Sequence, residues 1–244
     1  MIRAALALSF CLSVPAVAFA QADAARFRIS VNGGGQIGNT KVAQSFSVDK
    51  NLEPAPITAD ASVKRGVLAD AGVVARLAGP LGVGFALSYM SRSTAADVTA
   101  KIPHPFFFTQ LRTISGTAPI DRTEIAGHID VVYRVPIDGR FDVLLQGGPS
   151  IFNVRHTLVT DVTYVDVFPF DSPTFGAAMT ANATQTVVGL NAGADLTWRL
   201  RRTVGAGALI RYAHARATVG VANNPSVNVD AGGFQLGAGL RLLF

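Results

Sequence analysis

The feature that most constrains this chain is a two-residue alternation of apolar and polar side chains, which recurs eight times. Between residues 125 and 135, for example, Ile129 and Val131 flank Asp130. Successive side chains of a β-strand point to opposite faces, so the alternation predicts strands rather than helices. The predicted strands cover residues 27–32, 67–77, 81–92, 125–135, 141–146, 188–200, 204–212 and 234–244.

The composition supports strands and argues against several other classes of protein. The chain contains only 2 Glu and 4 Lys against 17 Arg and 24 Gly, so residues that favour helices are scarce. Such a composition argues against a helical bundle, a coiled coil or a charged disordered chain. The formal net charge is +5, but the arginines are scattered mostly singly, so no nucleic-acid partner is predicted.

The beginning of the chain is typical of a secretory signal peptide. Arg3 supplies a positive charge, residues 4–14 are apolar, and residues 18–20 fit a cleavage site. We therefore expect a signal peptide at residues 1–20 and one mature domain at residues 21–244.

The single cysteine, Cys11, lies within the predicted signal peptide. Disulfides, cysteine-bound zinc and thiol catalysis are therefore not expected in the mature chain. The alternative is a lipoprotein modified at Cys11. We disfavour it because Phe10 is bulkier than the residue that precedes such a cysteine.

The connections between the predicted strands alternate in length. Tight turns are expected at residues 78–80, 137–139 and 201–203, and the four other connections span about 10–25 residues each. No apolar stretch predicts a membrane-spanning helix, because the best candidate contains Arg76 and Pro80. Short turns at one end and long loops at the other are typical of a barrel that crosses a membrane, with both termini at the short-turn end.

Over residues 25–244 the chain resembles the small eight-stranded outer-membrane β-barrels of Gram-negative bacteria, of the OmpA transmembrane-domain, OmpX and OmpW type. The most specific matching feature is the last strand, whose alternation ends in Phe244. In that family such a terminal aromatic residue looks like the signal read by the outer-membrane assembly machinery. The resemblance therefore implies that Phe244 is an assembly signal.

The same resemblance implies a fold and a location. The expected fold is all-β, an eight-stranded antiparallel up-and-down transmembrane β-barrel. It would lie among outer-membrane lipid and lipopolysaccharide as a monomer, with periplasmic termini and extracellular long loops. More narrowly, residues 102–108 and 229–233 resemble poorly characterised barrels of environmental Gram-negative bacteria, for which no reaction is known.

The polar face of the predicted strands carries more positive than negative charge. Side chains fill the interior of an eight-stranded barrel, and buried charges need partners, so we predict a polar plug. A hairpin with Gly139 at positive φ would put Arg134 directly opposite Asp142. The next hairpin would put Asp195 diagonal to Arg211, within reach of a long side chain. The predicted lumen charges are Arg28, Asp70, Arg76, Arg92, Asp130, Arg134, Asp142, Asp195, Arg199, Arg211 and Arg241.

Four aromatic residues on the apolar face predict two girdles at membrane interfaces. Trp198 and Tyr133 lie near the short-turn ends of their strands, and Tyr89 and Tyr212 lie towards the other ends. The core of a soluble β-sandwich is the alternative for these rings. That alternative would leave seven arginines in a dry interior.

Two of the predicted long loops are rich in phenylalanine. One interpretation is a rim that binds a hydrophobic solute, lipopolysaccharide or another surface. We favour a second, in which the strands project above the bilayer and the loops pack together and bury these rings. The possible ligand contacts are Phe106, Phe107, Phe108, Phe168, Phe170 and Phe175.

No motif predicts a catalytic, cofactor-binding or metal site. Gly33, Gly35 and Gly38 match the dinucleotide fingerprint, but no helix follows to receive a pyrophosphate. The histidines lack the spacing of metal ligands. His128 and Asp130 share one strand face and resemble the base and its orienter in barrel lipid hydrolases. Because that face is predicted to line the lumen, we favour an interior histidine satisfied by hydrogen bonds.

Three functions remain in view. The favoured one is a non-enzymatic integral outer-membrane β-barrel with a plugged polar lumen and a structural, envelope-stabilising or surface-interaction role. A narrow pore or hydrophobic-solute channel is the alternative. A lipid-modifying barrel enzyme, which would need a Ser-His-acid cluster on the outer wall, is the second alternative.

Overall fold

The computed structural model describes residues 25–220 and 226–244, without the side chains of residues 39, 40, 63 and 64. The predicted signal peptide at residues 1–20 therefore lies outside the described residues. No helix in the described ranges is long and apolar enough to cross a membrane.

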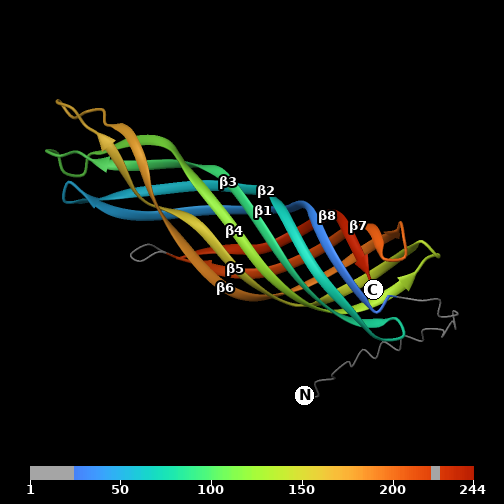
Figure 1. The fold of residues 1–244 in the computed structure, drawn as a ribbon. Coiled ribbons are helices and arrows are strands. Elements are labelled where there is room, and N and C mark those ends of the chain that lie inside the picture. Colours follow the sequence, from blue (N-terminus) through green and yellow to red (C-terminus); the bar gives the residue numbers. More distant parts are fainter. Residues whose placement is uncertain (1–24, 221–225) are drawn as a thin grey trace, which may run out of the picture.

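The chain forms one closed barrel in which each strand pairs with its neighbours in the sequence (Figure 1). All pairings are antiparallel, and the first strand closes the barrel against the last. The predicted all-β up-and-down fold is thus confirmed. The strands are β1 (Phe27–Lys50), β2 (Glu53–Ala78), β3 (Leu81–Pro103), β4 (Leu111–Pro136), β5 (Phe141–Val165), β6 (Thr174–Arg199), β7 (Val204–Val219) and β8 (Val227–Leu243).

Both described ends of the chain lie at one end of the barrel, which we call the proximal end. There the backbones of Phe27 and Phe244 exchange hydrogen bonds of 3.0 and 2.9 Å. The tight turns between β2 and β3, β4 and β5, and β6 and β7 lie at this end as well (Figure 1). The opposite end, which carries the remaining connections, is called the distal end.

The strands are much longer than the sequence predicted. β1 to β6 contain 23 to 26 residues each, whereas β7 and β8 contain 16 and 17. The prediction of long loops is therefore wrong, because strand occupies most of the residues assigned to them. Between described strands, the distal connections shrink to residues 51–52, 104–110 and 166–173.

The long strands escaped prediction because the alternation reverses its phase partway along them. In β4 the odd-numbered side chains face outwards throughout. Near the proximal end these outward residues are apolar, as at Ile129, but in the distal half they are polar, as at Thr117. Ile114 and Ile120 then occupy the inward face. In the sequence such a reversal looks like the end of a strand. In the structure the strand continues through it.

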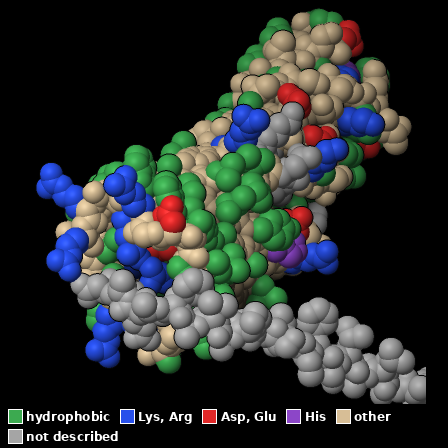
Figure 2. Space-filling view, turned by 90° about the vertical axis from the view of Figure 1, so that its right-hand side faces the viewer, with side chains coloured by type: hydrophobic (Ala, Val, Ile, Leu, Met, Phe, Trp, Pro, Cys, Tyr) green, Lys and Arg blue, Asp and Glu red, His purple; other side chains and the backbone are tan. Residues whose placement is uncertain are grey.

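The reversal divides the outer surface into two zones. On the face shown in Figure 2, hydrophobic side chains gather over one half of the barrel, whereas other side chains dominate the other half. In β3 the apolar zone runs from Leu81 to Tyr89, which corresponds to roughly 20–25 Å across a tilted strand. This height matches the hydrocarbon core that a transmembrane barrel must cover.

The four predicted girdle residues lie at the edges of this apolar zone. Tyr133 and Trp198 are exposed near the proximal end, and the Trp198 ring stacks on Phe141 with centroids 6.1 Å apart. Tyr89 and Tyr212 are exposed towards the distal edge. Their placement on the outer face agrees with the expected membrane interfaces.

The distal interior is an apolar core. Buried side chains from five strands meet there, among them Ile57, Ile102 and Val159, each with no exposed surface. The side-chain amide of Gln44 crosses the interior and bonds both the backbone N–H and the carbonyl of Val159, at 3.0 and 3.4 Å. This core closes the barrel above the apolar zone.

The hairpin between β4 and β5 differs from the expected one. Pro136, rather than Arg134, faces Asp142 across the ladder, and Gly139 is not among the residues with positive φ. The carboxylate of Asp138 accepts hydrogen bonds from the backbone N–H groups of residues 140 and 141, at 2.6 and 2.7 Å. These bonds close a four-residue turn without a left-handed glycine, which shifts the register by two residues.

We predict that the apolar zone contacts lipid, and one strand offers a matched test. Ile129→Arg places a charge in the middle of the zone, so it should reduce the free energy of unfolding in lipid vesicles by about 2–4 kcal/mol. Thr117→Arg, on the same face of β4 but in the distal half, should change it by less than about 0.5 kcal/mol. Equal effects in a denaturant titration would contradict the assignment.

Candidate functional site

The proximal interior is built around one carboxylate. Asp142 on β5 is 1% exposed and contacts three guanidinium groups. Arg28, from the opposite wall, donates to Oδ1, while Arg199 and Arg134 reach Oδ2 at 2.9 and 3.4 Å. The expected contact between Arg134 and Asp142 is therefore present, although it is diagonal rather than directly opposite.

A second group of charges lies deeper in the barrel. Arg241 holds Asp195 through two hydrogen bonds, of 3.0 and 2.5 Å, and Arg28 approaches the same carboxylate at 3.7 Å. Arg211 pairs with Asp70 across the barrel at 2.8 Å. Asp195 is diagonal to Arg211 in the ladder, as expected. Asp195 nevertheless pairs with Arg241, because the narrow lumen brings side chains of β6 and β8 within reach of each other.

A third layer, which the sequence analysis missed, caps the charged interior on its distal side. Glu124 accepts from Arg122 Nε at 2.7 Å, from Gln36 at 2.9 Å and from the backbone N–H of Gly232 at 3.0 Å. Arg122 and Glu124 lie just outside the predicted strand at residues 125–135. Like His128 they have even numbers, so they lie on the same inward face of β4. Extending the alternation by a few residues would have predicted them as lumen charges.

The remaining predicted lumen charges take no part in these ion pairs. Arg92 is half-buried and donates to the carbonyl of Arg65. Asp130 accepts a hydrogen bond of 2.8 Å from Asn191 instead of pairing with an arginine. Arg76 forms no ion pair within the described part of the chain and lines the proximal mouth.

His128 is enclosed between two serines. Its Nδ1 lies 2.8 Å from Ser150 Oγ, and its Nε2 lies 3.1 Å from Ser88 Oγ. The ring is 0% exposed, and neither nitrogen contacts a carboxylate. This geometry gives a serine neither a charged orienter for its base nor access to a substrate. Within residues 25–220 and 226–244, no group of three His, Cys, Asp or Glu side chains is placed to hold a metal ion.

The distal tip carries the phenylalanine-rich loops. We define the aromatic tip as the four exposed rings of these loops. The loops do contact each other, since the rings of Phe106 and Phe170 lie 5.5 Å apart, but the prediction that they bury their rings is wrong for these four, which stay largely exposed. Phe175 instead packs against the distal core, and Phe170 is half-buried. The aromatic tip consists of Phe106, Phe107, Phe108 and Phe168, which are 70%, 60%, 75% and 81% exposed.

The aromatic tip stands on a braced base. Arg112 on β4 is 7% exposed and binds Asp166 at 2.7 Å and the carbonyl of Pro103 at 2.8 Å, so it ties the two loops together. His104 Nδ1 accepts the backbone N–H groups of Phe106 and Phe107 at 3.1 and 3.2 Å. These hydrogen bonds hold the backbone of the loops in place, so the rings are exposed in a defined loop conformation.

A closed barrel with an apolar outer zone, two aromatic edges and a charged interior defines a transmembrane β-barrel. Residues 4–241 match the family described as Outer membrane protein beta-barrel domain. The chain therefore belongs to this family of outer-membrane proteins. No curated protein sequence matches it significantly.

Several solved outer-membrane barrels are similar to this chain. The outer membrane protein OprG of Pseudomonas aeruginosa has 12% identity and a TM-score of 0.48, covering 91% of this chain and 97% of its own. Neisserial surface protein A has 16% identity and a TM-score of 0.40, covering 91% and 100%. The Escherichia coli protease OmpT has 8% identity and a TM-score of 0.47, covering 89% and 96%.

We predict that Asp142 stabilises the proximal interior. Asp142→Asn leaves three arginines facing one another in a buried site, so it should lower the free energy of unfolding by about 3–5 kcal/mol in phosphate-free detergent. Asp97→Asn, on the exposed outer face of β3, should change it by less than about 0.5 kcal/mol. A stability for Asp142→Asn close to that of the native chain in a urea titration would disprove the role of this carboxylate.

Proposed function

We propose that the protein is a non-enzymatic outer-membrane barrel that holds the aromatic tip away from its membrane as a surface-interaction element. In this proposal the proximal end faces the periplasm and the distal end faces the exterior. The observation that carries the proposal is the aromatic tip itself, four largely exposed phenylalanines on loops fixed by the buried ion pair between Arg112 and Asp166.

The length of the strands supports this role. On β3 about 14 residues separate Tyr89, at the edge of the apolar zone, from Pro103 at the end of the strand. At about 3.3 Å per residue, and allowing for tilt, this segment lifts the tip roughly 30 Å above the membrane surface. A tip at that height reaches another surface more readily than its own bilayer.

The chemistry of the aromatic tip favours a lipid surface as its partner. Its rings project outwards, and the cavities described in the structure are lined by other residues. Of the nearby acids, Asp166 is already paired with Arg112. The exposed rings form an apolar tip, with the carboxylate of Asp171 also exposed on one of its loops, and such a tip suits shallow insertion into an apposed membrane better than the enclosure of a solute.

Two layers of the interior support a barrel closed to bulk solutes. The proximal layer is filled by ion pairs around Asp142 and Asp195. The distal layer is filled by apolar side chains such as Ile57 and Ile102. The buried setting of His128, without a carboxylate partner, supports the non-enzymatic part of the proposal.

Assembly in the outer membrane belongs to the same proposal. Phe244 is 61% exposed on the outer face at the proximal end, where a terminal aromatic signal is accessible. This position supports recognition by the assembly machinery of the outer membrane.

We predict that the reconstituted protein does not conduct as a general porin. Planar bilayers containing it should show no stepwise current of general-porin size, because both interior layers obstruct the lumen. A general porin inserted under the same conditions serves as the positive control. Large stable steps would refute the plugged barrel, and small steps would instead favour a narrow pore.

The aromatic tip should determine attachment to a lipid surface. Nanodiscs holding the protein should bind immobilised phospholipid vesicles, and changing Phe106, Phe107, Phe108 and Phe168 together to serine should weaken this binding at least about tenfold. The same four positions changed to leucine form the matched control, which should retain most of the binding. Equal binding of the native and serine proteins would overturn the proposed function.

A further inference from the structure

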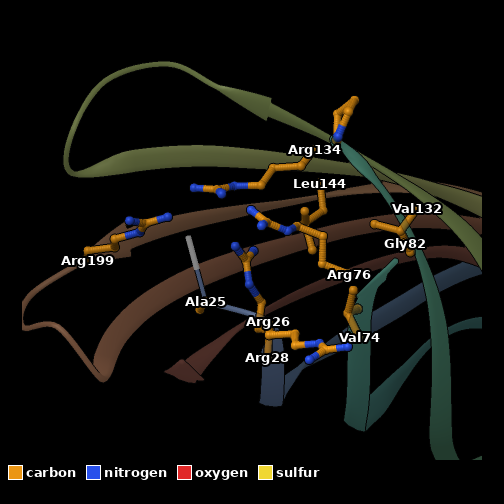
Figure 3. Close-up of a pocket in the computed structure, with 11 residues that line it drawn as sticks. Ala25, Arg26, Arg28, Val74, Arg76, Gly82, Val132, Arg134, Leu144 and Arg199 are labelled. Carbon is orange, nitrogen blue, oxygen red and sulfur yellow. The ribbon is translucent and has the colours of Figure 1, made fainter. Parts of the chain in front are cut away.

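The proximal mouth of the barrel is a cup of arginines. Figure 3 shows Arg76, Arg134 and Arg199 extending from β2, β4 and β6 towards a common space. Arg28 from β1 and Arg26, which precedes that strand, also line this cavity, whose lining includes five arginines and no carboxylate. We call these five side chains the arginine cup.

The described residues supply fewer negative charges to the arginine cup than it has arginines. At its floor Arg28, Arg134 and Arg199 share the carboxylate of Asp142, and Arg28 also approaches Asp195 at 3.7 Å. Arg76 has no ion pair in the described residues, and Arg26 is exposed. In addition, the Nε atoms of Arg134 and Arg199 are buried without a hydrogen-bond partner. Positive charge and unused donors therefore converge on one place.

The arrangement suits a small oxyanion. A guanidinium group donates two parallel hydrogen bonds to phosphate or carboxylate, and the closed barrel holds these groups on several strands without further ordering. Since Arg134 and Arg199 both reach Oδ2 of Asp142, their charged ends lie close enough to contact one small anion together. The cavity is small, about 30 Å³, which favours a small anion or the anionic end of a larger molecule.

We propose that the arginine cup is a binding site for a phosphate-class oxyanion at the proximal mouth of the barrel. This site is separate from the aromatic tip and does not depend on the proposed surface interaction. The anion has two sources that share this chemistry, a free phosphate in solution and the headgroup of a neighbouring phospholipid.

Calorimetric titration with inorganic phosphate tests the proposal in maltoside micelles, which carry no phosphate. The native protein should bind phosphate at one site, and Arg76→Gln should weaken the binding at least about tenfold without disturbing an ion pair. Arg155→Gln, at an exposed outer position on β5, is the matched control and should bind as the native protein does. Adding phosphatidylglycerol in place of phosphate tests the lipid source, and binding of either one that depends on Arg76 supports the site.

A second measurement uses the shared carboxylate. Phosphate should raise the unfolding temperature of Asp142→Asn more than that of the native protein, because the anion then replaces the missing negative charge among three arginines. The proposal is overturned if neither phosphate nor phosphatidylglycerol binds the native protein, or if Arg155→Gln loses as much affinity as Arg76→Gln.

Discussion

Closure of the hydrogen-bonded ladder is the constraint on which the rest of this structure depends. In lipid every backbone N–H and carbonyl needs a partner, and a sheet meets this need only when its first strand pairs with its last. Here the pairing of β1 with β8 completes the ring. Once the ring is closed, each side chain must face either the lumen or the surroundings, so strand parity assigns every residue to one of two environments.

This division explains why the barrel changes its interior along its length. Where the outer face meets lipid it is apolar, and the narrow lumen holds the charged residues, which must satisfy one another. Where the outer face meets water it is polar, as at Thr117, and the interior takes the ordinary apolar core of a soluble protein, as at Ile114. Glu124 and Arg122 lie near the junction, as the last ion pair before the apolar core.

The same reasoning shows how much the sequence could predict. Alternation was enough for the eight strands and the outward girdle residues, because these depend only on parity. It also placed Arg134 and Asp142 on the same face of adjacent strands, but the predicted register was wrong by two residues, so their contact is diagonal rather than direct. The ion pair between Arg211 and Asp70 could not be predicted, because it crosses the lumen and the register of a sheet relates only residues on adjacent strands. The length of the strands was missed because the phase reversal looks like a loop. The exposure of Phe106 was missed because burial at a tip depends on loop geometry that alternation does not encode.

The order of these layers also decides what the proximal mouth can do. An anion that enters the arginine cup meets Asp142 and then Asp195, both engaged by arginines, and beyond them the apolar layer around Ile57. Charged groups that leave water for an apolar interior lose hydration that this layer cannot replace. The cup therefore opens on one side only. An anion held there would occupy the end of a closed path, which is the behaviour of a binding site rather than of the entrance to a channel.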